Sequence, residues 1–189
     1  MTEKSILIVG VGGQGTLLSS RILGRAAIRA GHDVKVSEVH GMSQRGGSVV
    51  TYVKYGDQIA SPIIGLGEAD VILAFELLEA YRALPYLKKG GKIIVNTQRL
   101  NPMPVITGAA EYPGDILEKL RQAADVSALD ALALAQEAGS PKAANVALIG
   151  VMARETALEK QLWLDTLQET VPEKFLEINL RAFELGYQA

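Results

Sequence analysis

The hydrophobic pattern changes twice near the start of the chain. Residues 5–9 form a short apolar run rich in β-branched side chains, and residues 10–15 contain four glycines. From Thr16 onward the apolar residues recur at helical spacing, as Leu18, Ile22, Leu23, Ala26, Ala27 and Ala30. This order predicts a strand, a tight glycine turn and a helix that packs on a sheet.

The second and third predicted strands follow each other without a helix between them. Residues 33–38 and 48–54 are both β-rich, and the polar, glycine-rich segment between them is too short for a crossover helix. Two strands joined in this way are expected to run antiparallel. An ordinary Rossmann half carries a helix at this point, so the connection departs from that pattern.

The rest of the chain alternates between strands and helices and then becomes helical. Residues 69–75 and 92–96 are nearly continuous apolar runs, typical of strands covered on both faces. The pattern also predicts short strands within 58–64, 105–107 and 124–127, a turn at Gly90-Gly91, and helices at 76–87, 115–123, 129–138, 143–156, 159–170 and 172–189. The expected fold is α/β: a single-domain, Rossmann-like three-layer sandwich over residues 1–189, with a mostly parallel sheet, helices on both faces and a helical C-terminal third.

Two helical surfaces leave alternatives open. The polar residues of the last helix line one narrow stripe, formed by Glu177, Arg181, Glu184 and Gln188. The broad apolar surface around this stripe indicates either contact with another subunit or a helix tightly covered within the chain. A basic row on the first helix is typical of a solvated face or of a partner contact, and consists of Arg21, Arg25 and Arg29.

Composition excludes several classes of function. The chain has 189 residues, 48% of them hydrophobic, which is enough for one core that buries roughly 70% of the unfolded surface. Its 19 basic and 21 acidic residues give a net charge of −2, so neither nucleic-acid binding nor attraction to anionic membranes follows from charge. The absence of cysteine excludes disulfides, thiolate-ligated iron–sulfur clusters and Cys-type zinc sites.

Metal binding, membrane insertion and export are not expected either. The chain has two histidines, and no cluster of acids converges on them in the sequence. No apolar run approaches the ~20 residues of a membrane span, and the N-terminus leads directly into the first strand. We therefore expect a cytoplasmic protein.

The glycine turn is the first candidate site. Gly10, Gly12 and Gly15 have the spacing of the dinucleotide fingerprint, and Glu38 follows Gly15 by 23 residues, near the offset of an acid that holds a ribose hydroxyl. Residues Gly12, Gly13, Gln14 and Gly15 either bind an anion through backbone amides or only let the first helix pack close to the sheet. A self-sufficient NAD-dependent oxidoreductase is one hypothesis, opposed by the missing helix before Ser48.

The loop between the second and third strands is the second candidate site. Gly46 and Gly47 allow a turn that projects Arg45, whose guanidinium is suited to bidentate binding of a carboxylate or phosphate. An ion pair from Arg45 to Glu38 within the chain is the alternative. His40 is a weak catalytic candidate, because a histidine titrates near neutral pH but a loop histidine beside a glycine more often serves as a hydrogen-bonding spacer.

Taken together, the ordered motifs resemble a known family over nearly the whole chain. They are residues 12–15, 38–47, 61–62, 68–70, 76–80, 145–150 and 179–186. This set is similar to the gamma-type domain of the 2-oxoacid:ferredoxin oxidoreductases. The run from Val39 to Gly47 is its most specific part, and it resembles the beta subunits of the indolepyruvate branch, because related pyruvate and oxoglutarate enzymes usually have a different run before Arg-Gly-Gly.

The resemblance implies a function as one subunit of a larger enzyme. That enzyme carries out oxidative decarboxylation of an arylpyruvate, with coenzyme A acylation and ferredoxin reduction. The family places thiamine diphosphate, Mg²⁺ and the [4Fe–4S] clusters in the large (alpha) partner subunit, so none is expected on this chain, which also lacks a Gly-Asp-Gly start of a thiamine diphosphate motif. The chain is expected to form a hetero-oligomer and to be inactive alone.

Site roles follow from this resemblance as expectations. The phosphates of coenzyme A are the natural anion for Gly12, Gly13, Gln14 and Gly15. The segment containing Arg45, Gly46 and Gly47 is expected to meet the partner subunit or coenzyme A. No catalytic residue is assigned beyond the weak candidate His40, and no metal ligand is expected.

Overall fold

The sheet of this protein has six strands in the order β2-β3-β1-β4-β5-β6. The computed structural model describes residues 3–40 and 47–189. β3 runs antiparallel to both of its neighbours, and the remaining pairs are parallel. The strands are β1 Lys4–Val11, β2 Asp33–His40, β3 Ser48–Gly56, β4 Ala69–Ala74, β5 Leu87–Asn96 and β6 Asp125–Leu129. The mostly parallel sheet and the antiparallel pairing of β2 with β3 are therefore confirmed.

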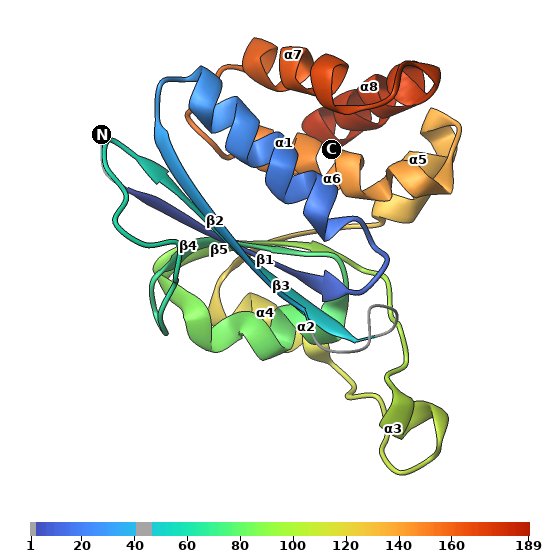
Figure 1. The fold of residues 1–189 in the computed structure, drawn as a ribbon. Coiled ribbons are helices and arrows are strands. Elements are labelled where there is room, and N and C mark those ends of the chain that lie inside the picture. Colours follow the sequence, from blue (N-terminus) through green and yellow to red (C-terminus); the bar gives the residue numbers. More distant parts are fainter. Residues whose placement is uncertain (1–2, 41–46) are drawn as a thin grey trace.

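Helices cover the sheet on both faces (Figure 1). One layer consists of α1 Thr16–Arg29, α5 Ala131–Ala138, α6 Ala144–Arg154, α7 Lys160–Thr170 and α8 Glu173–Gln188. The opposite layer consists of α2 Leu77–Ala83 and α4 Ile116–Ala123. We call these the upper and lower layers, after their places in Figure 1.

The hydrophobic core is divided between these two layers by the sheet. Alternate residues of β1 point to opposite faces, as the period of a strand requires. Ile6 and Ile8 belong to the upper cluster, with α1 and α6, whereas Leu7 and Val9 belong to the lower cluster, with α2 and α4. The continuous apolar run of β1 is therefore explained by burial on both faces.

The last helix packs closely against α6. α8 crosses α6 so closely that a Cβ on Gly150 would lie 2.1 Å from the Phe183 carbonyl oxygen, and one on Gly186 would lie 1.9 Å from the Ala147 carbonyl oxygen. Ala182 and Phe183 are fully buried at this crossing. This crossing buries part of the apolar surface of α8, whereas Leu176 and Leu180 are half-buried and Phe175 is 48% exposed, so contact of α8 with another subunit stays a prediction.

Three local predictions were wrong. Residues 58–64 form no strand, because Ile59 and Ile64 are buried singly and the Ile59 amide donates to the Asp33 carboxylate. Residues 105–107 lie at a short helix, α3 Met103–Ile106, where Pro104 has the backbone angle of a first helical turn. Gly90 and Gly91 lie inside β5, where a Cβ on Gly91 would come within 3.0 Å of the Ala69 and Asp70 carbonyl oxygens.

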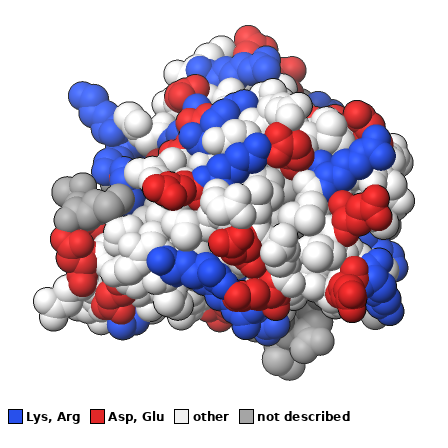
Figure 2. Space-filling view, turned by 90° about the horizontal axis from the view of Figure 1, so that it is seen from above, with Lys and Arg blue, Asp and Glu red and all other residues white. Residues whose placement is uncertain are grey.

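Two residues of the basic row of α1 make contacts with α7. Arg25 donates to the Thr170 hydroxyl at 3.0 Å, and Arg29 forms an ion pair with Glu169. Figure 2 shows the upper surface, where basic and acidic side chains are intermingled without a large region of one sign. Within the described ranges, no helix has the length and apolar composition of a membrane span.

Candidate functional site

The carboxyl ends of β1 and β4 form a point of divergence in the sheet. The chain leaves β1 for α1 in the upper layer and leaves β4 for α2 in the lower layer (Figure 1). Open α/β sheets bind ligands in the crevice that such a divergence creates. The glycine turn, the start of α2 and the segment after β5 all lie at this carboxyl edge, which is therefore the candidate site.

Two glycines of the turn are required by close packing. A Cβ on Gly15 would lie 2.7 Å from Asn145 Nδ2, and one on Gly10 would lie 3.0 Å from Gln14 Oε1 and 3.1 Å from Phe75 Cβ. Gly13 differs, because it has a φ of 101°, is exposed, and has open space where a side chain would be. The turn thus combines tight helix packing at Gly10 and Gly15 with an accessible backbone at Gly13.

Gln14 ties three distant segments together. Its Oε1 accepts from the Val11 amide at 2.7 Å, and its Nε2 donates to the Phe75 carbonyl at 3.0 Å and to Gln98 Oε1 at 3.2 Å. Both donor positions of the amide are thereby used. The side chain of Gln14 braces the turn against β4 and the segment after β5.

The first turn of α1 carries no side-chain cap. Its N-cap is Gly15, with a φ of 86°, and its first turn contains no acidic residue. Asn145 approaches from α6, and its side-chain amide donates to the Gly15 carbonyl at 3.4 Å. Free amides at the N-terminus of a helix favour an anion.

A cavity of about 300 Å³ lies on the lower side of this edge. It is lined by Val11, Gly12, Ser48, Glu76, Leu78, Glu79, Arg82, Leu100, Asn101 and Pro102. The two glutamates are almost fully buried, with exposed fractions of 1% for Glu76 and 4% for Glu79. Buried carboxylates require partners, and the contacts of both are made within the chain.

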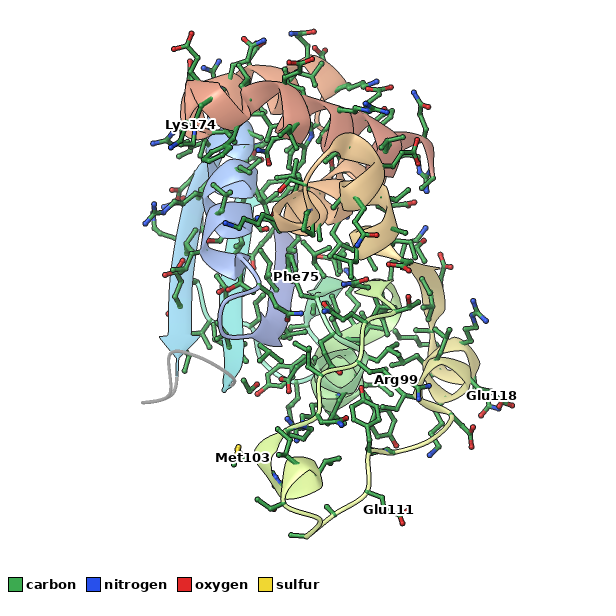
Figure 3. All side chains as sticks on the ribbon, turned by 90° about the vertical axis from the view of Figure 1, so that its right-hand side faces the viewer. Phe75, Arg99, Met103, Glu111, Glu118 and Lys174 are labelled. Atoms are coloured by element: carbon green, nitrogen blue, oxygen red, sulfur yellow. The ribbon has the colours of Figure 1, made fainter. Side chains whose placement is uncertain are left out.

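Glu76 holds the segment after β5 onto the start of α2. One carboxylate oxygen accepts from the Glu79 amide at 3.0 Å, which makes Glu76 the N-cap of α2. The other accepts from the Leu100 amide at 3.0 Å and from the Tyr112 hydroxyl. Burial and this hydrogen bond raise the pKa of the Tyr112 hydroxyl well above its usual value. Figure 3 shows Arg99 near this point, with the segment that bears Met103 and Glu111 projecting beyond it.

Glu79 links α2 to the first residue of β3. It accepts a hydrogen bond from the Ser48 hydroxyl, and its other oxygen lies 2.6 Å from Arg82 Nη1. The Arg82 side chain is 52% exposed, so this guanidinium also faces solvent at the cavity rim. Arg82 therefore places an exposed cation beside two buried carboxylates at this edge.

The residues predicted as sites are only partly brought together. The Gly12 amide donates to the Gly47 carbonyl at 2.8 Å, so the glycine turn and the end of the second candidate loop meet. Arg45 and Gly46 lie outside the described residues. His40 ends β2, where its backbone pairs with Val49. Glu38 accepts from the Ser20 hydroxyl at 3.0 Å and so faces α1.

Some residues of the site were missed in the sequence. Asn96 ends β5 with 2% exposure, and its side chain donates to the Phe75 carbonyl at 3.3 Å and accepts from the Ala131 amide at 3.1 Å. A polar residue that closes a buried apolar strand is a usable signal for such a position. Gln98 and Tyr112 carried no comparable signal, because their partners are far away in sequence. The described residues contain no cluster of three or more metal-ligating side chains.

Comparisons with known proteins agree with this architecture. The family model for pyruvate ferredoxin/flavodoxin oxidoreductases matches residues 5–189. An indolepyruvate oxidoreductase subunit IorB from Thermococcus kodakarensis is 44% identical and covers all of this chain and 96% of its own length. The subunit of the same name from Pyrococcus horikoshii is 42% identical, again over all of this chain and 96% of its own length.

Solved structures give the same result. The gamma subunit of a keto/oxoacid ferredoxin oxidoreductase from Geobacter sulfurreducens has a TM-score of 0.73 and 26% identity, covering 98% of this chain and 96% of that one. A 2-oxoglutarate:ferredoxin oxidoreductase from Magnetococcus marinus has the same fold, with a TM-score of 0.76 and 18% identity, and this chain covers 31% of it. The chain therefore belongs to the pyruvate ferredoxin/flavodoxin oxidoreductase family, in which it is similar to the indolepyruvate oxidoreductase subunits.

Proposed function

We propose that this chain is the smaller subunit of an indolepyruvate-type 2-oxoacid:ferredoxin oxidoreductase. The complex oxidatively decarboxylates an arylpyruvate, transfers the acyl group to coenzyme A and reduces ferredoxin. The observation that carries the proposal is the 44% identity, over the whole chain, to a subunit named for indolepyruvate. The similarity to subunits of that name in several organisms supports the same assignment.

The redox cofactors belong to a larger alpha subunit in this proposal. Iron–sulfur clusters are held by cysteine thiolates, and the chain contains no cysteine. No Gly-Asp-Gly sequence is present to begin a thiamine diphosphate–Mg²⁺ motif. The chemistry of decarboxylation and electron transfer is thus assigned to the partner, and the assembly to a cytoplasmic hetero-oligomer that passes electrons to ferredoxin.

The chain's own contribution is to bind and position coenzyme A at the carboxyl edge. The uncapped first turn of α1 and the accessible backbone of Gly13 favour a phosphate. Gln14 holds this turn in place through its contacts to Val11 and Phe75. Arg45, Gly46 and Gly47 are proposed to meet coenzyme A or the partner, since Gly47 adjoins Gly12.

The first test is co-expression of this chain with its partner under anaerobic conditions. Viologen reduction is measured with indolepyruvate and coenzyme A, alongside the iron and thiamine diphosphate contents of the purified sample. We expect activity from the complex and none from this chain alone. Recovery of the chain alone, with bound NAD and turnover of a nicotinamide cofactor, would overturn the proposal in favour of an independent dinucleotide enzyme.

A second test concerns Arg45. Arg45→Ala is expected to raise the KM for coenzyme A or to reduce assembly, because a guanidinium that binds phosphate or carboxylate is lost. Arg121→Ala, an exposed change on α4, is the matched control. Circular dichroism of the isolated chain should stay unchanged in both. If Arg45→Ala preserves assembly, turnover and the response to coenzyme A, this role of Arg45 is abandoned.

A further inference from the structure

The connection between β5 and α4 forms an arm that projects from the body of the molecule. The arm runs from Thr97 to Asp115 and contains one short helix, α3. Figures 1 and 3 show it in two perpendicular views, extending beyond the lower layer with Met103 on the part that lies away from the sheet. None of the other described elements packs extensively on α3. Connections of this length within a compact domain are usually either functional or disordered.

One buried carboxylate clamps the root of the arm. Glu76 is 1% exposed, and a single oxygen of it accepts from the Leu100 amide at 3.0 Å and from the Tyr112 hydroxyl. Because these two residues lie at the outgoing and the returning ends of the arm, Glu76 holds both ends together. The Arg99 guanidinium lies 5.6 Å from the centre of the Tyr112 ring and adds a cation–π contact. The direction in which the arm leaves the body is thereby fixed.

The tip of the arm, residues 102–110, folds on itself. The Ile106 amide donates to the Pro102 carbonyl at 3.1 Å. The Ala110 amide donates to the Pro104 carbonyl at 3.0 Å, after Gly108 has turned the chain with a φ of 76°. The two prolines further restrict the backbone. The tip therefore keeps its shape without support from the body, so that binding costs it little conformational entropy.

The exposed surface of the tip is apolar and uncharged. Met103 is 64% exposed and Ile106 is 65% exposed. Residues 100–110 contain no charged side chain, whereas basic and acidic side chains are intermingled on the surface in Figure 2. Two large apolar side chains exposed on an ordered projection are typical of a protein interface rather than of a solvated loop.

The charges around the tip disfavour a membrane as its occupant. Anionic lipid surfaces attract basic residues, whereas acidic residues border the returning end of the arm, at Glu111 and Asp115. Arg99, at the root, is turned to the Tyr112 ring. An uncharged apolar tip bordered by acids is thus better suited to an apolar recess of a protein.

The hollows of this chain are poor recesses for the tip of a second copy. The cavity at the carboxyl edge contains two buried carboxylates and Arg82. Two other hollows on the described surface are lined partly by charged side chains, which are Glu118 and Arg121 in one and Lys88, Lys89 and Asp125 in the other. Burial of an apolar tip against such groups would remove water from charges without replacing it.

The family provides a different partner. The relatives at 44% and 42% identity are named as subunits, and the matched family is one of multi-subunit oxidoreductases. The root of the arm also lines the carboxyl-edge cavity, through Leu100, Asn101 and Pro102. A subunit that binds the tip is therefore brought to the edge at which coenzyme A is proposed to bind.

We propose that the tip of the arm, at Met103 and Ile106, inserts into an apolar, uncharged recess of the large partner subunit. This inference rests on the proposed function, which supplies that subunit. The clamp at Glu76 holds the arm in the orientation for entry. The arm thus acts as the docking element that fixes the large subunit beside the carboxyl edge.

The test compares Ile106→Glu with Ile106→Leu and with Ile63→Glu. Ile106 is 65% exposed on the tip, and Ile63 is 54% exposed between β3 and β4, at the opposite edge of the sheet. The affinity of the full chain for the purified large subunit is measured anaerobically by biolayer interferometry, with circular dichroism as a check of folding. We expect Ile106→Glu to weaken binding about tenfold or more, because its carboxylate enters an apolar recess without a partner. Ile106→Leu and Ile63→Glu should bind as wild type.

The other outcomes overturn the inference or the proposed function separately. Equal binding by wild type and Ile106→Glu, or equal weakening by Ile106→Glu and Ile63→Glu, removes the arm from the interface. The inference also fails if Ile106→Glu leaves binding to the large subunit unchanged but abolishes a homodimer in sedimentation, or abolishes co-sedimentation with phosphatidylcholine vesicles. Failure of the wild-type chain to bind the large subunit overturns the proposed function, and the role of the arm with it.

Discussion

At the scale of single residues, most polar side chains of the carboxyl edge hold the chain to itself. Glu76 joins α2 to residues 100 and 112, and Asn145 joins α6 to the glycine turn. Gln14 spans from Val11 to Gln98. Ligand contacts at this edge are therefore expected from backbone amides and from the exposed cation Arg82 rather than from these braces.

We predict that Gln14→Ala destabilises the isolated chain. The substitution removes hydrogen bonds to the Val11 amide, the Phe75 carbonyl and Gln98. It leaves the partly buried Val11 amide without its acceptor, whereas Asn96 still donates to the Phe75 carbonyl. The expected loss is about 1–3 kcal/mol in the free energy of unfolding, measured by urea denaturation. Gln136→Ala, at an exposed position of α5, should change it by less than about 0.5 kcal/mol. Equal stabilities of the two variants would refute the bracing role.

Alkaline pH should reveal the buried hydroxyl of Tyr55. Burial raises its pKa from 10.0 to about 12. As the pH rises, the Tyr55 hydroxyl loses its proton in the unfolded chain before it does so in the folded one. The contribution of Tyr55 to the free energy of unfolding is therefore complete below pH 10 and is lost as the pH rises from 10 to about 12. Ultraviolet titration of tyrosinate should therefore show a component near pH 12 that Tyr55→Phe removes and that Tyr81→Phe, at an exposed position, retains. Persistence of that component in Tyr55→Phe would contradict the assignment.

At the scale of elements, the contact between α6 and α8 is the tightest helix packing in the described part of the chain. Both helices present a glycine at the crossing, and in each case the neighbouring atom is a backbone carbonyl oxygen. A backbone atom cannot rotate away as a flexible side chain does. Part of the apolar surface of α8 is therefore buried within the chain, at Ala182 and Phe183.

We expect Gly150→Ala to lower the free energy of unfolding by about 3 kcal/mol or more, since α8 must shift to admit one methyl group. Gly24→Ala in α1 is the matched control, because its Cβ would lie 3.6 Å from Val34 Cγ1 in ordinary contact. Gly24→Ala should instead raise the free energy of unfolding by about 0.5–1 kcal/mol, because alanine leaves the unfolded chain less conformational freedom than glycine does. Opposite shifts of the thermal midpoint for the two variants test both statements, and a neutral Gly150→Ala would refute the first.

At the scale of the whole molecule, the two layers differ in how completely they cover the sheet. In the described part of the chain, the upper layer has five helices, whereas no helix of the lower layer packs extensively on β2 and β3. β2 is also an edge strand, with one side unpaired in the sheet order. An open apolar face beside an unpaired edge is a common route to self-association.

We therefore predict that the chain purified without its partner self-associates. The weight-average sedimentation coefficient should rise with protein concentration, and Val39→Glu should reduce this rise because it places a charge on the open face. Ile28→Glu should leave it unchanged. Concentration-independent sedimentation of the wild type would show that the open face is compatible with a monomer.

Periodicity and turn chemistry were sufficient for most of the fold. The glycine turn, the buried strands 69–75 and 92–96, the direct link from β2 to β3 and the three C-terminal helices all follow from local patterns. Local patterns failed at short apolar runs, which are equally compatible with a strand and with a short helix or an irregular buried segment. Residues 105–107 are β-branched and helical, and residues 58–64 bury Ile59 and Ile64 without pairing.

The candidate site was predictable only in its outline. The glycines of the turn were found because their spacing is local, and the family resemblance pointed to the segment ending at Gly47. Gln98 and Tyr112 were not found, because their partners lie 36 or more residues away in sequence. A side chain with a distant partner looks the same in the sequence as one that is solvated.

The sequence by itself determined most of the order of elements, the departure from a Rossmann half before β3 and the family, because these depend on neighbouring residues and on ordered motifs. Only the tertiary structure decided that Glu38 turns toward Ser20, that α8 crosses α6 in close contact, and that no described helix packs extensively on the lower face of β2 and β3. The physical reason is that each of these depends on which distant segment occupies the adjacent space. Packing in three dimensions, rather than local pattern, decides that occupancy.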